Sequence, residues 1–502
     1  DSYGDLPRHE IARVSELLQS QLLQPINPNP VLPHLAESDL FILEGSGPTD
    51  PSFNEYNALF LRDGASMLLS GVAGNKDTLG DEVVLSGLSE GFSYSLGHFH
   101  YQTDGFRDNN DLTLDIANAY LQWAFSSDTS FQTEIRYMSA DQGDLPLRFD
   151  LDNYSKTLRK DSITRSVRLG LHHGSSPRSD FIGTVILQDR EDEDSFSMPG
   201  LSVTSALDSQ GLLAEAQHLF QGDGLDTILG AGFLSSDLDR AEELAVGPMP
   251  MNSRESDTLE HVNAYGYGSL EGPGESTWTV GLSADFFDGP TVKQDQVNPK
   301  LGCVWKLHPK ALVHGAVIRT LQRTLVAGQT IEPTQVAGFN QFFDDGLGVD
   351  AWLYGLGAHL QLGENVFTGV RGYLRELQVP YTLTTASPAG VVTLEEEADW
   401  KEEVIRGYIN LVINPRLTAD AALQYELFDR EDFVAETLFE ELTTSRASLG
   451  LSYFHPSGFR ARVQGTFIDQ QGEFGDPVLG PVDSRDDQFF VLDLSLGYLM
   501  PD

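Results

Sequence analysis

The sequence predicts an all-β protein, a transmembrane antiparallel β-barrel of about 20 strands (roughly 18 to 22) preceded by a short helix and linker. Segments whose side chains alternate with period two recur from about residue 62 to the end, which is the pattern of strands. Short turns alternate between these segments with long polar connections, including those expected at 189–209, 238–258 and 378–402, as in barrels with short periplasmic turns and long outer loops. A β-sandwich or a propeller has no reason to place a long loop at every second connection.

The N-terminal segment, residues 1–54, differs from the barrel domain that we expect over residues 55–502. Its apolar residues Ile11, Val14, Leu18 and Leu22 have helical spacing, and the prolines of PINPNPVLPHL follow them. We therefore expect a helix over 8–24 and an extended linker over 25–54. The helix either docks on the main domain or is the remnant of a longer helical module. The segment would lie in the periplasm or inside the barrel.

The stretch RLTADAALQYELF, residues 416–428, shows what each face of a strand would contact. Leu423 and Tyr425 share one parity, and Asp420 and Glu426 share the other. We expect the apolar face to contact outer-membrane lipid and the polar face to line a watery lumen. If the protein is soluble, the apolar face packs into a core instead. The chain has no apolar run near the roughly 18 to 20 residues of a membrane-spanning helix, so strands would have to cross the bilayer.

The charge and cysteine content exclude several classes of partner and cofactor. The formal net charge is −43, from 75 acidic and 32 basic residues, and phosphate would be repelled by it, so nucleic acid is not an expected partner. The one cysteine, Cys303, has no partner within the chain, and no Cys/His ligand cluster is evident. Structural zinc, iron–sulfur clusters and covalently attached haem are therefore not expected.

Catalysis is not expected either. GLSEG at 87–91 matches GxSxG, but Ser89 falls at a predicted hairpin turn, whereas a hydrolase needs a strand-to-helix turn. His98 and His100 share one strand face at a spacing that suits a metal, but no third ligand is in view. We interpret these two histidines as polar residues of the lumen.

The acidic stretches are a candidate cation site. They lie at 189–194 and 395–403, in segments expected on the outer side. Dense carboxylates favour Ca²⁺ or Mg²⁺. The alternative is a solvated, salt-adapted surface, and the absence of EF-hand spacing favours it. No other cofactor is expected. The candidate ligands are Glu191, Asp192, Glu193, Asp194, Glu395, Glu396 and Glu397.

Charged residues on neighbouring strands are candidates for the lumen. Charges of both signs on the inner face of a barrel can create a transverse field that shapes selectivity. The candidates are Arg319, Arg323, Arg371, Arg375, Arg460, Arg462, Asp420 and Glu426.

The long connection at 323–350 is a candidate constriction. It either folds inward and narrows the channel or is an ordinary external loop. Its polar candidates are Gln329, Glu332, Gln335, Asn340 and Gln341.

Two runs resemble a known family. VNPKLGCVWKLHPKALVHGAVIRTLQRTL (297–325) and QTIEPTQVAGFNQFFDD (329–345) resemble the barrel portion of TonB-dependent-receptor-like outer-membrane proteins, in particular a plugless branch associated with tetratricopeptide-containing chains. FNEYNALFLRDG (53–64) and FSYSLGHFHYQTDGFRDNNDL (92–112) fit the same resemblance. It implies a location in the bacterial outer membrane and a periplasmic helical-repeat or TonB-like partner that contacts residues 1–54. These 54 residues cannot form the plug domain of such receptors.

The expected function is passage of a solute or polymer through a polar lumen, gated by the loop at 323–350 or by the N-terminal segment. One alternative is a structural or adhesive surface protein that is anchored by its barrel and binds divalent cations or proteins. Another is a receptor or polysaccharide-export barrel that works with a separate plug or helical-repeat partner.

Overall fold

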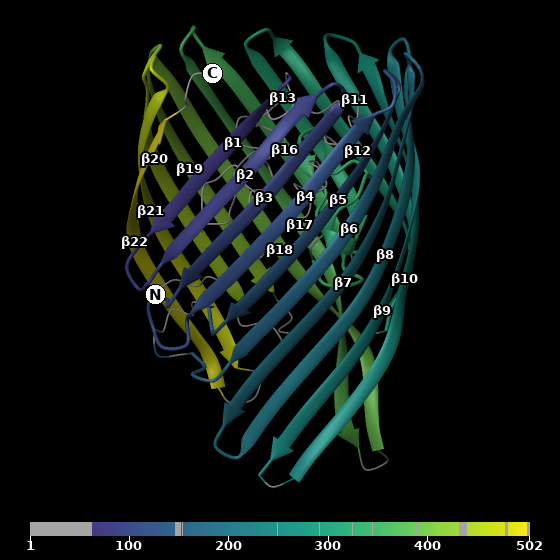
Figure 1. Cartoon of the computed structure of the whole chain (residues 1–502), viewed down its shortest axis with the longest axis vertical. Coiled ribbons are helices and arrows are strands. Elements are labelled where there is room, and N and C mark those ends of the chain that lie inside the picture. Colours follow the sequence, from purple (N-terminus) through teal and green to yellow (C-terminus); the bar gives the residue numbers. More distant parts are fainter. Residues whose placement is uncertain are drawn as a thin grey trace.

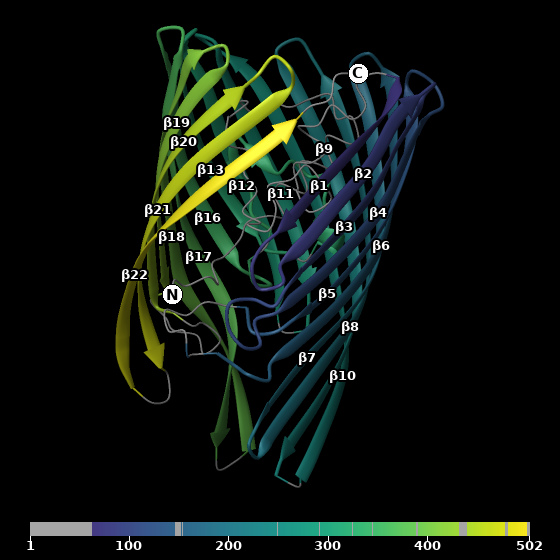
Figure 2. The same ribbon diagram turned by 60° about the vertical axis from the view of Figure 1, so that its left-hand side comes forward.

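The chain forms one sheet of 20 strands that curls into a barrel (Figures 1 and 2). The computed structural model describes residues 63–145, 152, 154–247, 249–290, 292–323, 325–343, 345–387, 390–430, 439–476 and 480–498. The predicted fold class and strand number are confirmed. The helix expected at 8–24 and the linker at 25–54 lie outside the described residues. In the described part of the chain, no helix is long and apolar enough to cross a bilayer.

The strands vary greatly in length. The first group is β1 (Gly64–Ala73), β2 (Leu79–Ser89), β3 (Phe92–Thr103), β4 (Leu112–Ala124), β5 (Thr129–Gln142), β6 (Arg159–Ser176), β7 (Ser179–Met198), β8 (Leu201–Gln221), β9 (Leu225–Val246) and β10 (Met249–Gly272). The second group is β11 (Ser276–Asp288), β12 (Lys293–His308), β13 (Ala311–Leu321), β16 (Asp350–Leu362), β17 (Val366–Ser387), β18 (Gly390–Asn414), β19 (Leu417–Arg430), β20 (Glu441–Phe454), β21 (Phe459–Asp476) and β22 (Gly480–Tyr498).

Each of these strands pairs antiparallel with the next one along the chain. The ladder between β13 and β16, for example, runs from Ala311↔Leu360 to Leu321↔Asp350. A 3₁₀ turn, η1 (Val326–Gly328), and a two-stranded hairpin, β14 (Gln335–Val336) with β15 (Phe339–Asn340), lie in the connection between β13 and β16. The described ladders form a continuous series from β1 to β22.

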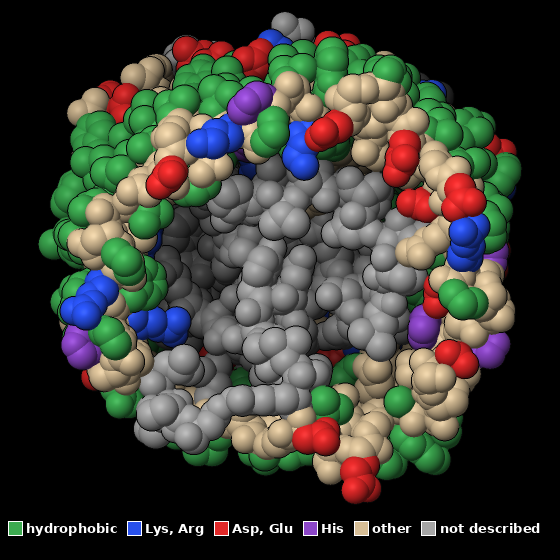
Figure 3. Space-filling view, turned by 90° about the horizontal axis from the view of Figure 1, so that it is seen from above, with side chains coloured by type: hydrophobic (Ala, Val, Ile, Leu, Met, Phe, Trp, Pro, Cys, Tyr) green, Lys and Arg blue, Asp and Glu red, His purple; other side chains and the backbone are tan. Residues whose placement is uncertain are grey.

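The outer face of the barrel is apolar, and the space-filling view shows this along its rim (Figure 3). On β19, Leu423 is 67% exposed and Tyr425 is on the same face, whereas Asp420 and Glu426 have the opposite parity and are partly buried. The facing predicted for residues 416–428 is therefore confirmed. Soluble monomers rarely expose an apolar surface of such extent, and lipid would cover it.

The prediction of long loops at 189–209, 238–258 and 378–402 is wrong. Strands β7 and β8 continue until two residues separate them, β9 and β10 do the same, and β17 runs to Ser387 before β18 begins at Gly390. Figure 1 shows β7 to β10 extending well beyond the neighbouring strands. On β7, residues 189–194 are all charged, so both faces of the strand carry charged side chains there. The apolar alternation is therefore lost although the strand continues.

Candidate functional site

The connection between β13 and β16 lies inside the barrel, against its inner wall. Its residues 325–343 contact strands on the polar side, and Ile331 and Val336 are 1% and 0% exposed. Ala327 N–H donates to Gln188 Oε1 of β7, and Gln217 Nε2 of β8 donates to the carbonyl of Ile331. We call residues 322–349 the inner loop.

Glycines on the wall make room for the hairpin of the inner loop. A Cβ atom at Gly302 of β12 would lie 2.7 Å from side-chain atoms of Val336 and Ala337. A Cβ atom at Gly355 of β16 would overlap the ring of Phe339. Real Cβ atoms essentially never show such short contacts. The wall must therefore be flat here, that is, without side chains at these two positions, for the hairpin to pack closely.

A buried ion cluster joins the inner loop to the wall at Glu332. The carboxylate accepts bonds from Lys300 Nζ (3.0 Å) and Arg323 Nη2 (2.7 Å), and from Tyr267 Oη (2.8 Å) and Asn263 Nδ2 (3.1 Å). Burial opposes its charged form, but the Lys300 and Arg323 cations outweigh burial and hold the pKa of Glu332 below its ordinary value. Because Lys300 and Glu332 side chains are each 2% exposed, water screens this attraction little.

A second buried carboxylate, which belongs to the wall, holds the residues next to Glu332 in the inner loop. Glu215 of β8 accepts bonds from Thr330 Oγ1 (2.5 Å) and from the backbone N–H of Ile331 (2.8 Å). Near the other end of the loop, Arg375 of β17 pairs with Asp345 of the loop and, at 2.5 Å, with Glu402 of β18. The inner loop is thus fixed to the wall at several separate points.

The five polar candidates of the inner loop mostly bind the wall or one another. Gln329 accepts a bond from Arg168 of β6, and Gln335 Nε2 donates to Asn340 within the hairpin at 2.9 Å. Gln341 Nε2 donates to Tyr267 Oη at 3.0 Å, and Glu332 is the centre of the ion cluster. Gln329, Glu332 and Gln341 therefore attach the loop to the wall, whereas Gln335 and Asn340 join the two strands of its hairpin.

The basic candidates divide between the two faces of the barrel. Arg371 and Arg375 share the parity of the inward Tyr373, and Arg323 is a buried residue of the inner loop. Arg319 has the parity of the exposed Val317 and not that of the inward His314, so it lies on the outer face. It pairs there with Asp350 at 2.6 Å.

On β19, the acidic candidates Asp420 and Glu426 form inward pairs with arginines of β20 and β21. Arg462 of β21 binds Asp420 through both carboxylate oxygens, each at 3.0 Å, and Arg446 of β20 lies 3.7 Å from Glu426. Arg460 is exposed beside the β20–β21 turn.

The two histidines of β3 lie on the outer face of the barrel. His98 and His100 share the parity of Leu96, which is 49% exposed on the outer face, so their interpretation as lumen residues is wrong. His100 pairs there with Asp115 at 2.7 Å. Ser89 ends β2 directly before a two-residue hairpin turn, as predicted, and a hairpin turn of this kind is not a nucleophile elbow.

The acidic candidates alternate across their strands. On β7, Asp192 and Asp194 have inward parity, whereas Glu191 and Glu193 face outward. Glu396 and Glu397 are exposed on β18, and the side chain of Glu395 lies outside the described residues. Within the described ranges, no three His, Cys, Asp or Glu side chains are arranged to hold a metal ion. The Ca²⁺ or Mg²⁺ site stays a prediction.

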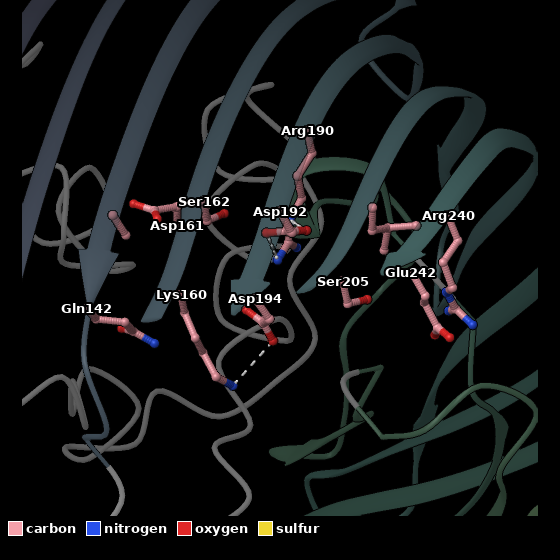
Figure 4. Close-up of a pocket in the computed structure, with 12 residues that line it drawn as sticks. Gln142, Lys160, Asp161, Ser162, Arg190, Asp192, Asp194, Ser205, Arg240 and Glu242 are labelled. Atoms are coloured by element: carbon pink, nitrogen blue, oxygen red, sulfur yellow. Dashed lines mark hydrogen bonds and ion pairs between the residues drawn. The ribbon is translucent and has the colours of Figure 1, made fainter. Parts of the chain in front are cut away.

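A polar pocket of about 580 Å³ lies on the inner face of β5 to β9, toward the end of the barrel at which β7 to β10 extend beyond their neighbours (Figure 4). Lys160, Arg190 and Arg240 alternate there with carboxylates, including the pairs Lys160–Asp194 (3.8 Å) and Arg190–Asp192 (2.7 Å). Sequence reasoning missed this pocket because its residues lie in segments that were expected to be loops.

Sequence reasoning also missed the wall residues that hold the inner loop. The signal was present, since Glu215, Asn263 and Lys300 stand at inward positions of strands, but period two cannot show which inward residues a loop will cover.

An apolar outer face, a polar inner face and a loop packed within define a large transmembrane β-barrel. No family model matches the chain, and no curated protein matches it. Among solved structures, the copper transporter OprC superposes with a TM-score of 0.65 at 12% identity, over 87% of this chain and 72% of that chain. The ferric yersiniabactin uptake receptor FyuA from Yersinia pestis gives 0.64 at 14% identity, over 87% and 72%.

The ferripyoverdine receptor of the outer membrane of Pseudomonas aeruginosa gives a TM-score of 0.62 at 13% identity, over 87% of this chain and 66% of that chain. At these identities the likeness shows the fold. It agrees with the receptor-like barrel that the sequence resemblance implied. The plugless branch and the tetratricopeptide association stay predictions.

Proposed function

We propose that the protein is a transporter of the bacterial outer membrane, in which a solute or polymer passes through the polar lumen and the inner loop gates that passage. The observation that carries the proposal is the attachment of residues 322–349 to the inner wall through the Glu332 ion cluster. Removal of one partner from a buried ion cluster is strongly destabilising, so this cluster holds the loop against the wall inside the lumen.

Two further observations support transport. The outer face carries the apolar side chains that lipid requires, and the inner face carries paired charges such as Arg462–Asp420, which are typical of an aqueous pore. The solved neighbours bear names of a copper transporter and of receptors for ferric siderophores, so metal ions or their complexes are reasonable first cargoes to test. A periplasmic helical-repeat or TonB-like partner that contacts residues 1–54 is part of the proposal.

Ion conductance in a planar bilayer tests the proposal. Four forms of the detergent-purified protein are compared: the intact chain, a form with residues 322–349 replaced by a short Gly/Ser linker, a form without residues 1–54, and a form with both changes. We expect conductance to rise when the inner loop is replaced. If only deletion of residues 1–54 opens the lumen, that segment is the gate. Silence of all four forms would refute a channel and favour a surface anchor.

A further inference from the structure

We propose that His314 and His359 form a two-imidazole site for a divalent transition-metal ion of the Cu²⁺, Ni²⁺ or Zn²⁺ class on the inner wall. The two residues lie on the paired strands β13 and β16 and have inward parity. Their Nε2 atoms share a hydrogen bond of 3.1 Å, and the planes of their rings differ by 20°. Imidazole nitrogen is the ligand that these ions share.

The other nitrogen of each ring already has an oxygen partner. His314 Nδ1 lies 2.7 Å from the backbone carbonyl of Ala337, which can only accept a hydrogen bond, so the proton of neutral His314 is on Nδ1 and Nε2 carries a lone pair. His359 Nδ1 lies 2.8 Å from the hydroxyl of Tyr408. Without a metal ion, Nε2–H of His359 donates to Nε2 of His314, and Nδ1 of His359 accepts from the Tyr408 hydroxyl. A bound ion would take the place of that proton, which moves to Nδ1 of His359, where Nδ1–H donates to the Tyr408 oxygen. Metal-binding histidines are commonly oriented in this way.

The spacing of the two nitrogens suits a shared ion. With metal–nitrogen bonds of about 2.0 to 2.1 Å, two nitrogens 3.1 Å apart subtend roughly 95–102° at the metal. That angle lies between the values for square-planar and tetrahedral coordination. The ion would lie off the line that joins the two nitrogens, so both rings must turn from their mutual hydrogen bond to direct their lone pairs at it.

Glycines on the same wall keep this space free. Gly357 pairs with His314, and a Cβ atom there would overlap the Nε2 atom of that ring. Gly369 pairs with both His359 and Tyr408, and a Cβ atom there would lie 2.6 Å from His359 Nδ1. A side chain at either position would break the alignment of the rings.

The site would use two protein ligands, since among the described residues no group of three His, Cys, Asp or Glu side chains could hold a metal ion. His359 is partly exposed, so water or a ligand carried by the ion can fill the remaining positions. Cu²⁺ should bind most tightly of the three ions by the usual order of affinities.

Electron paramagnetic resonance of Cu²⁺ bound to the full chain, purified in detergent without a histidine tag, tests the site. We expect one Cu²⁺ per chain with hyperfine coupling to two imidazole nitrogens. His359→Gln should abolish the two-nitrogen signal and weaken binding at least about tenfold, which is a loss of about 1.4 kcal/mol. His455→Gln, in the exposed β20–β21 turn, is the matched control and should retain the signal.

Gly357→Ala provides an independent test because it removes no ligand. It should displace the His314 ring and reduce the two-nitrogen signal as His359→Gln does. Retention of the barrel in each variant is checked by its heat-dependent mobility on gels. Absence of a two-nitrogen signal from the parent chain, or an unchanged signal in both variants, would overturn the proposal.

Discussion

Removal of the Glu332 carboxylate should release the inner loop. Loss of one partner of a buried ion cluster typically costs about 3–5 kcal/mol because the remaining charges stay desolvated. Two features place Glu332→Ala toward the lower value. Arg323 keeps Asp285 at 3.9 Å, and Lys300 keeps the hydroxyl of Tyr267 at 2.9 Å. At about 1.4 kcal/mol per tenfold change, the open fraction of the loop should rise at least about 100-fold.

A single cysteine in the loop measures this opening. Thr334 is 1% exposed, so Thr334→Cys in a Cys303→Ser background should react with a maleimide only when the loop leaves the wall. The labelling rate then follows the open fraction as long as closing is faster than labelling. Glu332→Ala should accelerate labelling by the factor given above.

Glu271→Ala is the matched control, since Glu271 is an exposed residue at the turn end of β10, far along that strand from Asn263. It should leave the labelling rate unchanged, and both variants should retain the gel mobility of the folded barrel. If Glu332→Ala labels no faster than the control, the ion cluster does not hold the loop and the reasoning is wrong.

Four further substitutions test the facing of the strands and the attachment of the loop. Leu423→Arg should destabilise the barrel by about 2–4 kcal/mol if it lies near the bilayer midplane, whereas Gln424→Arg should be tolerated, as measured by urea unfolding in lipid vesicles. Gly355→Ala should displace the Phe339 ring and accelerate cysteine labelling of the inner loop. Arg375→Ala leaves its two carboxylate partners without their buried cation and should cost about 3–5 kcal/mol in the same unfolding assay.

Each of these predictions has an outcome that would contradict it. Equal effects at Leu423 and Gln424 would refute the assigned facing. Gly268→Ala on β10, where a Cβ atom meets only ordinary contacts, is the control for Gly355→Ala, and equal labelling of the two would show that the hairpin does not need a flat wall. Arg462→Ala removes a partly exposed pair and should cost less than Arg375→Ala; the reverse order would refute the role of burial.

Much of the fold could be predicted because lipid and water impose opposite demands on the two faces of a strand. Leu423 and Glu426 have opposite parity, and that alone predicts where each lies. The same criterion failed where both faces carry charged side chains. At Glu191 and Asp192 the charges alternate across a continuing strand, and the absence of apolar residues suggested a loop instead.

The candidate site was less accessible to sequence reasoning because it depends on contacts between distant segments. Glu332 could be selected as a polar residue of a long connection, but its partners Asn263 and Lys300 belong to β10 and β12. Nothing local to those strands indicates that a loop covers them. Arg319 shows the converse error, since its charge suggested the lumen while its parity places it with Val317.

The base of the inner loop is closed by the ladder pair Leu321↔Asp350, so both ends of the loop are held on neighbouring strands. A released loop therefore cannot diffuse away, and its effective concentration at the wall remains high, on the order of millimolar for short flexible tethers. Rebinding is an intramolecular event that needs no second component. If the inner loop gates the lumen as proposed, a cargo would have to compete with this rebinding throughout its passage, and the loop would return to the wall once the cargo has left.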